Sequence, residues 1–166
     1  MSGYDAKHII NTDQSGFSYE YVSKRTLENI GNKHVLVSAQ SVHATTHSYT
    51  IQPMLNMNGE LLGKLMIILQ EPDGEFGPRV QKDINQYLPP NVVVTCSKSG
   101  KSNNKIIKQF LIECLKPVSS DNFILMQDSW SAHNDVAEIE DIFGDKCTLL
   151  VIPEGTTDHI QPLAVY

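Results

Sequence analysis

The sequence has little of several features that would assign it to a class at once. It contains three cysteines, Cys96, Cys114 and Cys147, which are far apart and odd in number. This pattern argues against a disulfide framework and against a CxxC-type metal site, and it favours a reducing, intracellular compartment. No apolar run approaches the length of a membrane span. The N-terminus also lacks the charged-then-apolar layout of a signal peptide.

Positive charge is scarce as well. The chain has 13 Lys and Arg against 19 Asp and Glu, a net charge of −6. A dedicated nucleic-acid-binding module is usually basic, so the bulk charge counts against that class. It does not exclude the class, because a cluster of catalytic carboxylates is itself acidic and contacts with DNA can be local. At 166 residues and 40% hydrophobic content, without repeats, residues 1–166 are expected to form one domain with its own core.

The most informative stretch present is residues 122–133. Its apolar run predicts a buried strand over 123–128 that ends at Asp128, followed by a polar turn and a helix over 134–143. A carboxylate at the C-terminal end of a central strand faces the crevice where open α/β sheets bind ligands. The alternative is an ordinary cap or turn aspartate. Trp130 and His133 in the turn are interpreted as packing residues.

The remaining pattern predicts a mixed α/β sheet. A strand over 7–13 carries Asp13, whose alternative role is that of a turn residue before Gly16. Asn58-Gly59 predicts a type I′ hairpin turn. Strands are expected over 48–57, 60–70, 91–96 and 147–152, and helices over 80–87 and 103–116. A strand meander followed by strand–helix–strand–helix–strand favours parallel pairing in the second half.

One candidate site is basic. The segment Thr95–Ser102 follows an apolar strand and begins a helix, as a phosphate-binding P-loop does, but Thr95 stands where that motif requires glycine. The segment is otherwise a solvated helix start or a local patch for a DNA backbone. The candidate nucleic-acid contacts are Lys98, Lys101, Lys105 and Lys108. His43 and His47 have the spacing of a helical metal pair, in a composition typical of a loop or strand.

A second candidate site is acidic. It consists of Asp13 and Asp128, if their two strands lie side by side. Close carboxylates repel one another, and shared divalent cations keep them ionised most readily. Two such ions about 4 Å apart activate an attacking water or hydroxyl and stabilise the leaving oxygen, which is phosphodiester chemistry. The sequence alone does not establish that the two residues meet.

Three blocks, residues 11–16, 126–133 and 152–163, resemble the signatures of the DDE superfamily endonucleases. The likeness is to the transposases of the pogo/Tigger and mariner class and covers about residues 8–166. It implies a ribonuclease H-like α/β fold with a five-stranded mixed sheet, the first three strands antiparallel, and helices on both faces. It also implies a nuclear protein that cleaves and transfers DNA strands with Mg²⁺ or Mn²⁺, and it leaves open an oligomer.

Within this resemblance, Asp13 matches the first catalytic acid and Asp128 the second, whereas Ala164 stands at the position of the third. A methyl group cannot bind a metal, so we expect impaired activity. Glu154 and Asp158 are acids in the loop before that position and are weaker replacements. Ala164 is either an engineered substitution or natural decay in a domesticated transposon relic.

Two further expectations follow from the resemblance. The chain would be a catalytic core truncated at its C-terminus, without the family's N-terminal helix-turn-helix region. The alternative function is a catalytically dead, domesticated nucleic-acid-binding or protein-interaction module.

Overall fold

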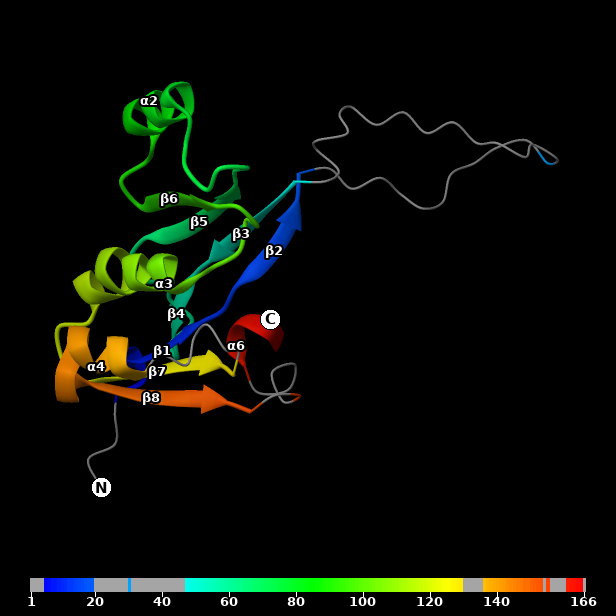
Figure 1. The fold of residues 1–166 in the computed structure, drawn as a ribbon. Helices are drawn as coiled ribbons and strands as arrows, with labels where there is room; N and C mark the ends of the chain where they lie inside the picture. Colours follow the sequence, from blue (N-terminus) through cyan, green and yellow to red (C-terminus); the bar gives the residue numbers. More distant parts are fainter. Residues whose placement is uncertain are drawn as a thin grey trace.

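A computed structural model describes residues 5–19, 30, 47–129, 136–153, 155 and 161–165. Figure 1 shows the arrangement of the helices and strands in this part of the chain. Five residues discussed above lie outside the described residues: His43, Trp130, His133, Glu154 and Asp158.

The helices and strands alternate much as the hydrophobic pattern predicts. The strands are β1 (Ile9–Thr12), β2 (Ser15–Ser18), β3 (Ser48–Gln52), β4 (Met54–Asn56), β5 (Leu65–Gln70), β6 (Val92–Ser97), β7 (Phe123–Asp128) and β8 (Cys147–Ile152). The α-helices are α2 (Pro78–Tyr87), α3 (Asn104–Phe110), α4 (Val136–Phe143) and α6 (Pro162–Val165). Short 3-10 turns are η1 (Ala6–His8), η3 (Lys116–Val118) and η5 (Gly144–Lys146), and α3 continues into a π-helical turn, η2 (Leu111–Leu115).

The strands form two mixed sheets of four strands each, in the orders β4-β1-β7-β8 and β2-β3-β5-β6. The pairs β1–β7, β7–β8 and β5–β6 are parallel, and the other pairs are antiparallel. The prediction of a single five-stranded sheet is therefore wrong, because the strands form two sheets of four. Among the described strands, β6 pairs with β5 alone, so β6 forms one edge of its sheet.

Pro53 explains why the expected sheet is divided. Proline has no backbone N–H, so it cannot donate to the ladder between the two long strands of the meander. The flanking pairs are Thr12 with Met54 and Ser15 with Ile51, which leaves two residues on each strand between them. The register therefore does not slip. One antiparallel ribbon, β1–β2 with β3–β4, runs through both sheets (Figure 1).

The turn at Asn58-Gly59 differs from the predicted type I′ turn. Gly59 has φ +81°, but no described residue other than glycine has a positive φ. The carbonyl of Asn56 accepts from the amide of Gly59 at 3.0 Å, and its side-chain Oδ1 accepts from the amides of Asn58 and Glu60, each at 3.0 Å. This is a type I turn followed by a left-handed glycine, the usual three-residue hairpin loop. The following strand begins only at Leu65.

The hydrophobic core lies between the sheets and the helices α3 and α4. The predicted apolar face of α3 and η2 is buried: Ile106, Ile107, Phe110 and Cys114. On the strands, Ile10 and Leu125 belong to the same cluster. Because side chains alternate along a strand, Asn11 and Met126 point to the opposite face. That face carries the candidate active site.

The helix α2 stands apart from the core. Pro78 lies in its first turn, where the missing N–H costs nothing. None of its residues is buried, and Figure 1 shows it beyond the edge strand β6. In the described part of the chain, no helix has the length and apolar character that a bilayer crossing requires.

Candidate active site

The candidate active site lies where β1 and β7 end. The two strands are parallel neighbours, and Asn11 is paired with Met126. Asp128 is the last residue of β7, and Asp13 directly follows β1. Continuing the register by two residues brings Asp13 beside Asp128, on the face that carries Asn11. Adjacent strands are about 4.8 Å apart, so two such carboxylates are close enough to share one ion.

A chain of polar side chains holds the backbone on either side of Asp13. Thr12 is buried, and its hydroxyl donates to the carbonyl of Pro53 at 2.9 Å. The side-chain amide of Gln52 donates through Nε2 to the Thr12 hydroxyl at 3.3 Å and accepts through Oε1 from Nε2 of Gln14 at 3.0 Å. The carboxylate of Asp13 accepts from the backbone N–H of Gln14 at 2.8 Å. These side-chain hydrogen bonds connect the two strands at Pro53, where the backbone ladder is interrupted.

The short helix α6, which contains Ala164, is attached to β1 by two buried amide side chains, which we call the α6 anchor: Asn11 and Gln161. Asn11 donates to the carbonyl of Met126 at 3.1 Å and accepts from the amide of Leu163 at 3.1 Å. Gln161 donates to the carbonyl of Thr12 at 3.1 Å. The anchor attaches α6 to β1, the strand that leads to Asp13.

The α6 anchor was missed by the sequence analysis, together with Thr12 and Gln52. Asn11 is 1% exposed and Gln161 is 0% exposed. A buried polar residue in an otherwise apolar strand is the signal that was available, because such a group must find a hydrogen-bond partner. The Oε1 atom of Gln161 is buried and has no partner among the described residues.

The four candidate lysines are not brought to the carboxylates. Lys105 and Lys108 lie on α3, which packs on the opposite face of the sheet. Lys108 also forms an ion pair with Glu138 of α4, with 3.7 Å between the nitrogen and the oxygen. Lys98 and Lys105 line a separate cavity, and Lys101 is exposed on the turn between β6 and α3. The turn that carries Lys98 and Lys101 lies nearer to the ribbon, because Thr50, the partner of Gly16 in the ladder, donates to the carbonyl of Gly100.

The P-loop-like segment forms a compact turn. Gly100 has φ +68°, and a Cβ there would lie 2.7 Å from the carbonyl oxygen of Ser48. The amide of Gly100 donates to the carbonyl of Ser97 at 3.3 Å, and the amide of Lys101 donates to the hydroxyl of Ser99 at 3.3 Å. Thr50 donates to the carbonyl of Gly100 at 2.7 Å. Because these amides bond within the turn, they do not converge on a phosphate.

A large cavity lies at a different place. It has a volume of about 870 Å³ and lies between β6, α3 and the loop before α2. In the strand orders, β5 and the β1–β2/β3–β4 ribbon separate β6 from β7. Concavity is a good guide to small-ligand sites. It is a weaker guide to a site for a polymer, because a phosphodiester of a nucleic acid can reach carboxylates that do not lie in a deep cavity. The candidate active site is therefore the pair of strand ends.

The donor set at the strand ends suits a hard divalent cation. Mg²⁺ binds one or two carboxylates together with waters and substrate phosphates. Asp13 and Asp128 supply two carboxylates, and residue 164, the next residue after Leu163 of the α6 anchor, supplies none. No cluster of three His, Cys, Asp or Glu side chains occurs among the described residues. The chemistry of these donors therefore fits a divalent cation that takes its remaining ligands from water or substrate.

The cysteines show no sign of metal binding or nucleophilic activation. Burial raises the pKa of Cys114 to about 12 and that of Cys147 to about 11. Burial is also the main cause of a raised pKa at Cys96, with Glu71 and Glu75 adding to it. Reactive and metal-binding cysteines need a lowered pKa, so these three are structural thiols.

Comparisons with known proteins support the fold. The described structure is similar to that of the Mos1 transposase paired-end complex with left transposon end, with a TM-score of 0.53 over 97% of this chain. The fold of this chain is transposase-like. Sequence identity is 11%, so the similarity concerns the fold, and this chain spans 40% of the length of that neighbour. No family model matches the chain. A search of curated proteins also found no match.

Proposed function

We propose that this chain is a DNA-binding domain derived from a DDE transposase of the pogo/Tigger and mariner class, acting in the nucleus. Asp13 and Asp128 bind Mg²⁺ or Mn²⁺, and strand cleavage is impaired because Ala164 occupies the third ligand position. The observation that carries the proposal is the parallel register of β1 and β7, in which Asn11 pairs with Met126, two residues before each aspartate. The attachment of α6 to β1 at Asn11 supports it, because it brings the third position to the same strand.

Each part of the site has a role in the proposed chemistry. A divalent ion bound there would activate an attacking water or hydroxyl and stabilise the leaving oxygen of a phosphodiester. Asp13 and Asp128 would hold the ion through their carboxylates at the ends of neighbouring strands. The α6 anchor holds the backbone of residue 164 against β1, so an acid at that position would complete the ligand set.

The test restores the missing acid. Ala164→Asp should produce Mg²⁺- or Mn²⁺-dependent nicking of duplex DNA, at least about a hundredfold above the parent chain, because changes even to outer-shell groups of metal sites cost 10–100-fold. Ala164→Asn is the matched control, since the asparagine side chain has nearly the same shape as that of aspartate but carries no charge. Asp13→Asn in the Ala164→Asp background should abolish the gained activity. If neither Ala164→Asp nor the parent cuts DNA or binds Mn²⁺ in a titration, the proposed site is wrong.

A second candidate function is a catalytically dead module that still binds nucleic acid. It is favoured by the alanine at the third position and by the location of Lys105 and Lys108 on α3, which packs on the face opposite to that of Asn11. The same experiment separates the two functions. Binding of DNA by both the parent chain and Ala164→Asp, without cleavage by either, would support the dead module.

A further inference from the structure

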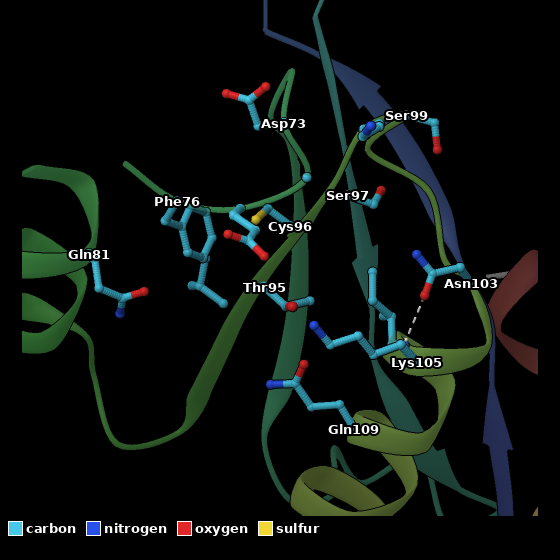
Figure 2. A pocket seen from close by; sticks show the side chains of 15 residues that line it. Asp73, Phe76, Gln81, Thr95, Cys96, Ser97, Ser99, Asn103, Lys105 and Gln109 are labelled. Carbon is cyan, nitrogen blue, oxygen red and sulfur yellow. Dashed lines mark hydrogen bonds between the residues drawn. The ribbon is translucent and has the colours of Figure 1, made fainter. Parts of the chain in front are cut away.

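The large cavity follows the outer edge of β6. It is lined by six consecutive residues, Val94–Ser99, so it extends along the second half of the strand and into the turn that follows (Figure 2). β6 is the last strand of its sheet among the described residues. Along such an edge, alternate residues direct their backbone N–H and C=O groups away from the sheet, ready to pair with another strand.

Two walls rise beside this edge. One is α3, with Asn103, Lys105 and Gln109, and Figure 2 shows the side chains of Lys105 and Gln109 directed toward Thr95 of the strand. The other consists of the loop Asp73–Phe76 and Gln81 at the beginning of α2. The walls thus form a groove, the β6-edge groove, that is open along the strand.

One end of the groove is closed. Gly74 lies against the aliphatic part of Lys98, since a Cβ there would be 3.3 Å from its Cγ. The turn that carries Gly74 is fixed by two backbone bonds: the amide of Glu71 donates to the carbonyl of Ser97 at 3.0 Å, and the amide of Gly74 donates to the carbonyl of Glu71 at 2.9 Å. The closed end is therefore held in place by the β5–β6 pair.

The two walls have opposite charges. The α3 wall carries Lys105, whereas the loop wall carries Asp73 and Glu75. The thiol of Cys96, on β6 between the walls, is affected by charges from both sides. Burial is the largest cause of its raised pKa, Glu71 and Glu75 raise the pKa further, and Lys105 lowers it. Lys98 adds a positive charge at the closed end, beside Gly74. Along the open part of the groove, an extended ligand fits best if it presents negative charge to Lys105 and positive charge to Asp73 and Glu75.

We propose that the β6-edge groove binds an extended segment of a partner protein, which adds to β6 as an outer strand. In a strand, successive side chains point to opposite sides. A segment with alternating acidic and basic residues would therefore direct its acidic side chains to Lys105 and its basic side chains to Asp73 and Glu75. Its backbone would pair with the free edge of β6, which is the mode of recognition known as β-augmentation.

A nucleic-acid strand fits this groove less well. Its phosphates carry one sign of charge along the whole backbone, so they would face Asp73 and Glu75 on the loop wall. The groove also lies on the far side of β5 and the β1–β2/β3–β4 ribbon from the strand ends of β1 and β7. The peptide proposal is therefore independent of the proposed nuclease site, and either can fail alone.

The probe is a fluorescent octapeptide of strictly alternating Glu and Lys with blocked ends, titrated with the full chain by anisotropy at low salt. The control is a block peptide of the same composition, four Glu followed by four Lys. The alternating peptide should bind at least about tenfold more tightly. Two further peptides are N-methylated on every second backbone nitrogen, one at the odd-numbered and one at the even-numbered positions. One of them should bind about tenfold more weakly and the other should bind as before, because only alternate N–H groups face β6.

A charge reversal on the chain completes the test. Lys105→Glu should weaken binding of the alternating peptide about tenfold, whereas Lys64→Glu, an exposed lysine outside the groove, should leave it unchanged. Three results would overturn the proposal: no binding of the alternating peptide, equal binding of the block peptide, or equal binding of the two N-methylated peptides. Displacement of the peptide by an oligo-dT strand whose own binding depends on Lys105 would instead assign the groove to nucleic acid.

Discussion

Replacing Asn11 with alanine tests how the candidate active site is assembled. Asn11 is 1% exposed, and its side chain joins three segments: it lies on β1, donates to Met126 of β7 and accepts from Leu163 of α6. Alanine removes both bonds and leaves the partly buried carbonyl of Met126 on β7 without this partner. The amide of Leu163 loses its acceptor, so α6 is expected to separate from β1.

The magnitude follows from these two bonds. A hydrogen bond contributes about 0.5–1.5 kcal/mol, and a buried group left without a partner costs about 1–3 kcal/mol. The Leu163 amide can reach water once α6 separates, so only the Met126 carbonyl bears that cost in full. We expect Asn11→Ala to lower the free energy of unfolding by about 2–3 kcal/mol.

Two measurements check this prediction. Urea unfolding followed by circular dichroism gives the global change, and amide hydrogen exchange at Leu163 reports the separation of α6, with protection falling at least about tenfold. Asn91→Ala is the matched control because Asn91 is exposed and only its backbone carbonyl accepts a hydrogen bond, from Leu65. In the Ala164→Asp background, Asn11→Ala should also reduce nicking, although both aspartates remain.

The reasoning would be refuted by a loss of less than about 0.5 kcal/mol together with unchanged exchange at Leu163, since a surface substitution gives a change of that size. Additivity of Asn11→Ala with Gln161→Ala would also contradict it, because two residues that hold the same helix should be coupled in a double-mutant cycle.

The remaining predictions concern the turn after β6 and the buried thiols. Gly100→Ala should destabilise the fold by about 1–3 kcal/mol, because its Cβ would meet the Ser48 carbonyl at 2.7 Å at φ +68°; Gly144→Ala, at φ +57° with open space around it, should cost about 1 kcal/mol in the same urea assay. Iodoacetamide at pH 8 should modify Cys96 before Cys114, as followed by mass spectrometry. The pKa of Cys114, about 12, leaves roughly one thiol in ten thousand ionised at this pH. Equal rates of modification would contradict the assigned burial. Because the folded Cys114 keeps its proton where the unfolded thiol loses it, stability should fall as pH rises from 9 toward about 12, and less so in Cys114→Ala.

Sequence alone determined the features that depend on local periodicity. The apolar runs predicted β7 and β8 with their observed bounds, Phe123–Asp128 and Cys147–Ile152. The three-and-four spacing on α3 predicted its buried face. Such patterns are readable because a strand or helix repeats its side-chain directions every 2 or 3.6 residues, whatever lies around it.

Only the tertiary structure decided how these parts combine. The bond between Gln161 and Thr12 joins residues 149 positions apart, and that between Leu163 and Asn11 spans 152. The division of the sheet at Pro53, the parallel pairing of β1 with β7 and the location of Lys105 on the opposite face depend likewise on pairing between distant segments. Local patterns indicate a hairpin or a parallel crossover, but they do not decide which strands distant in sequence become neighbours, because that choice is made by the packing of the whole chain.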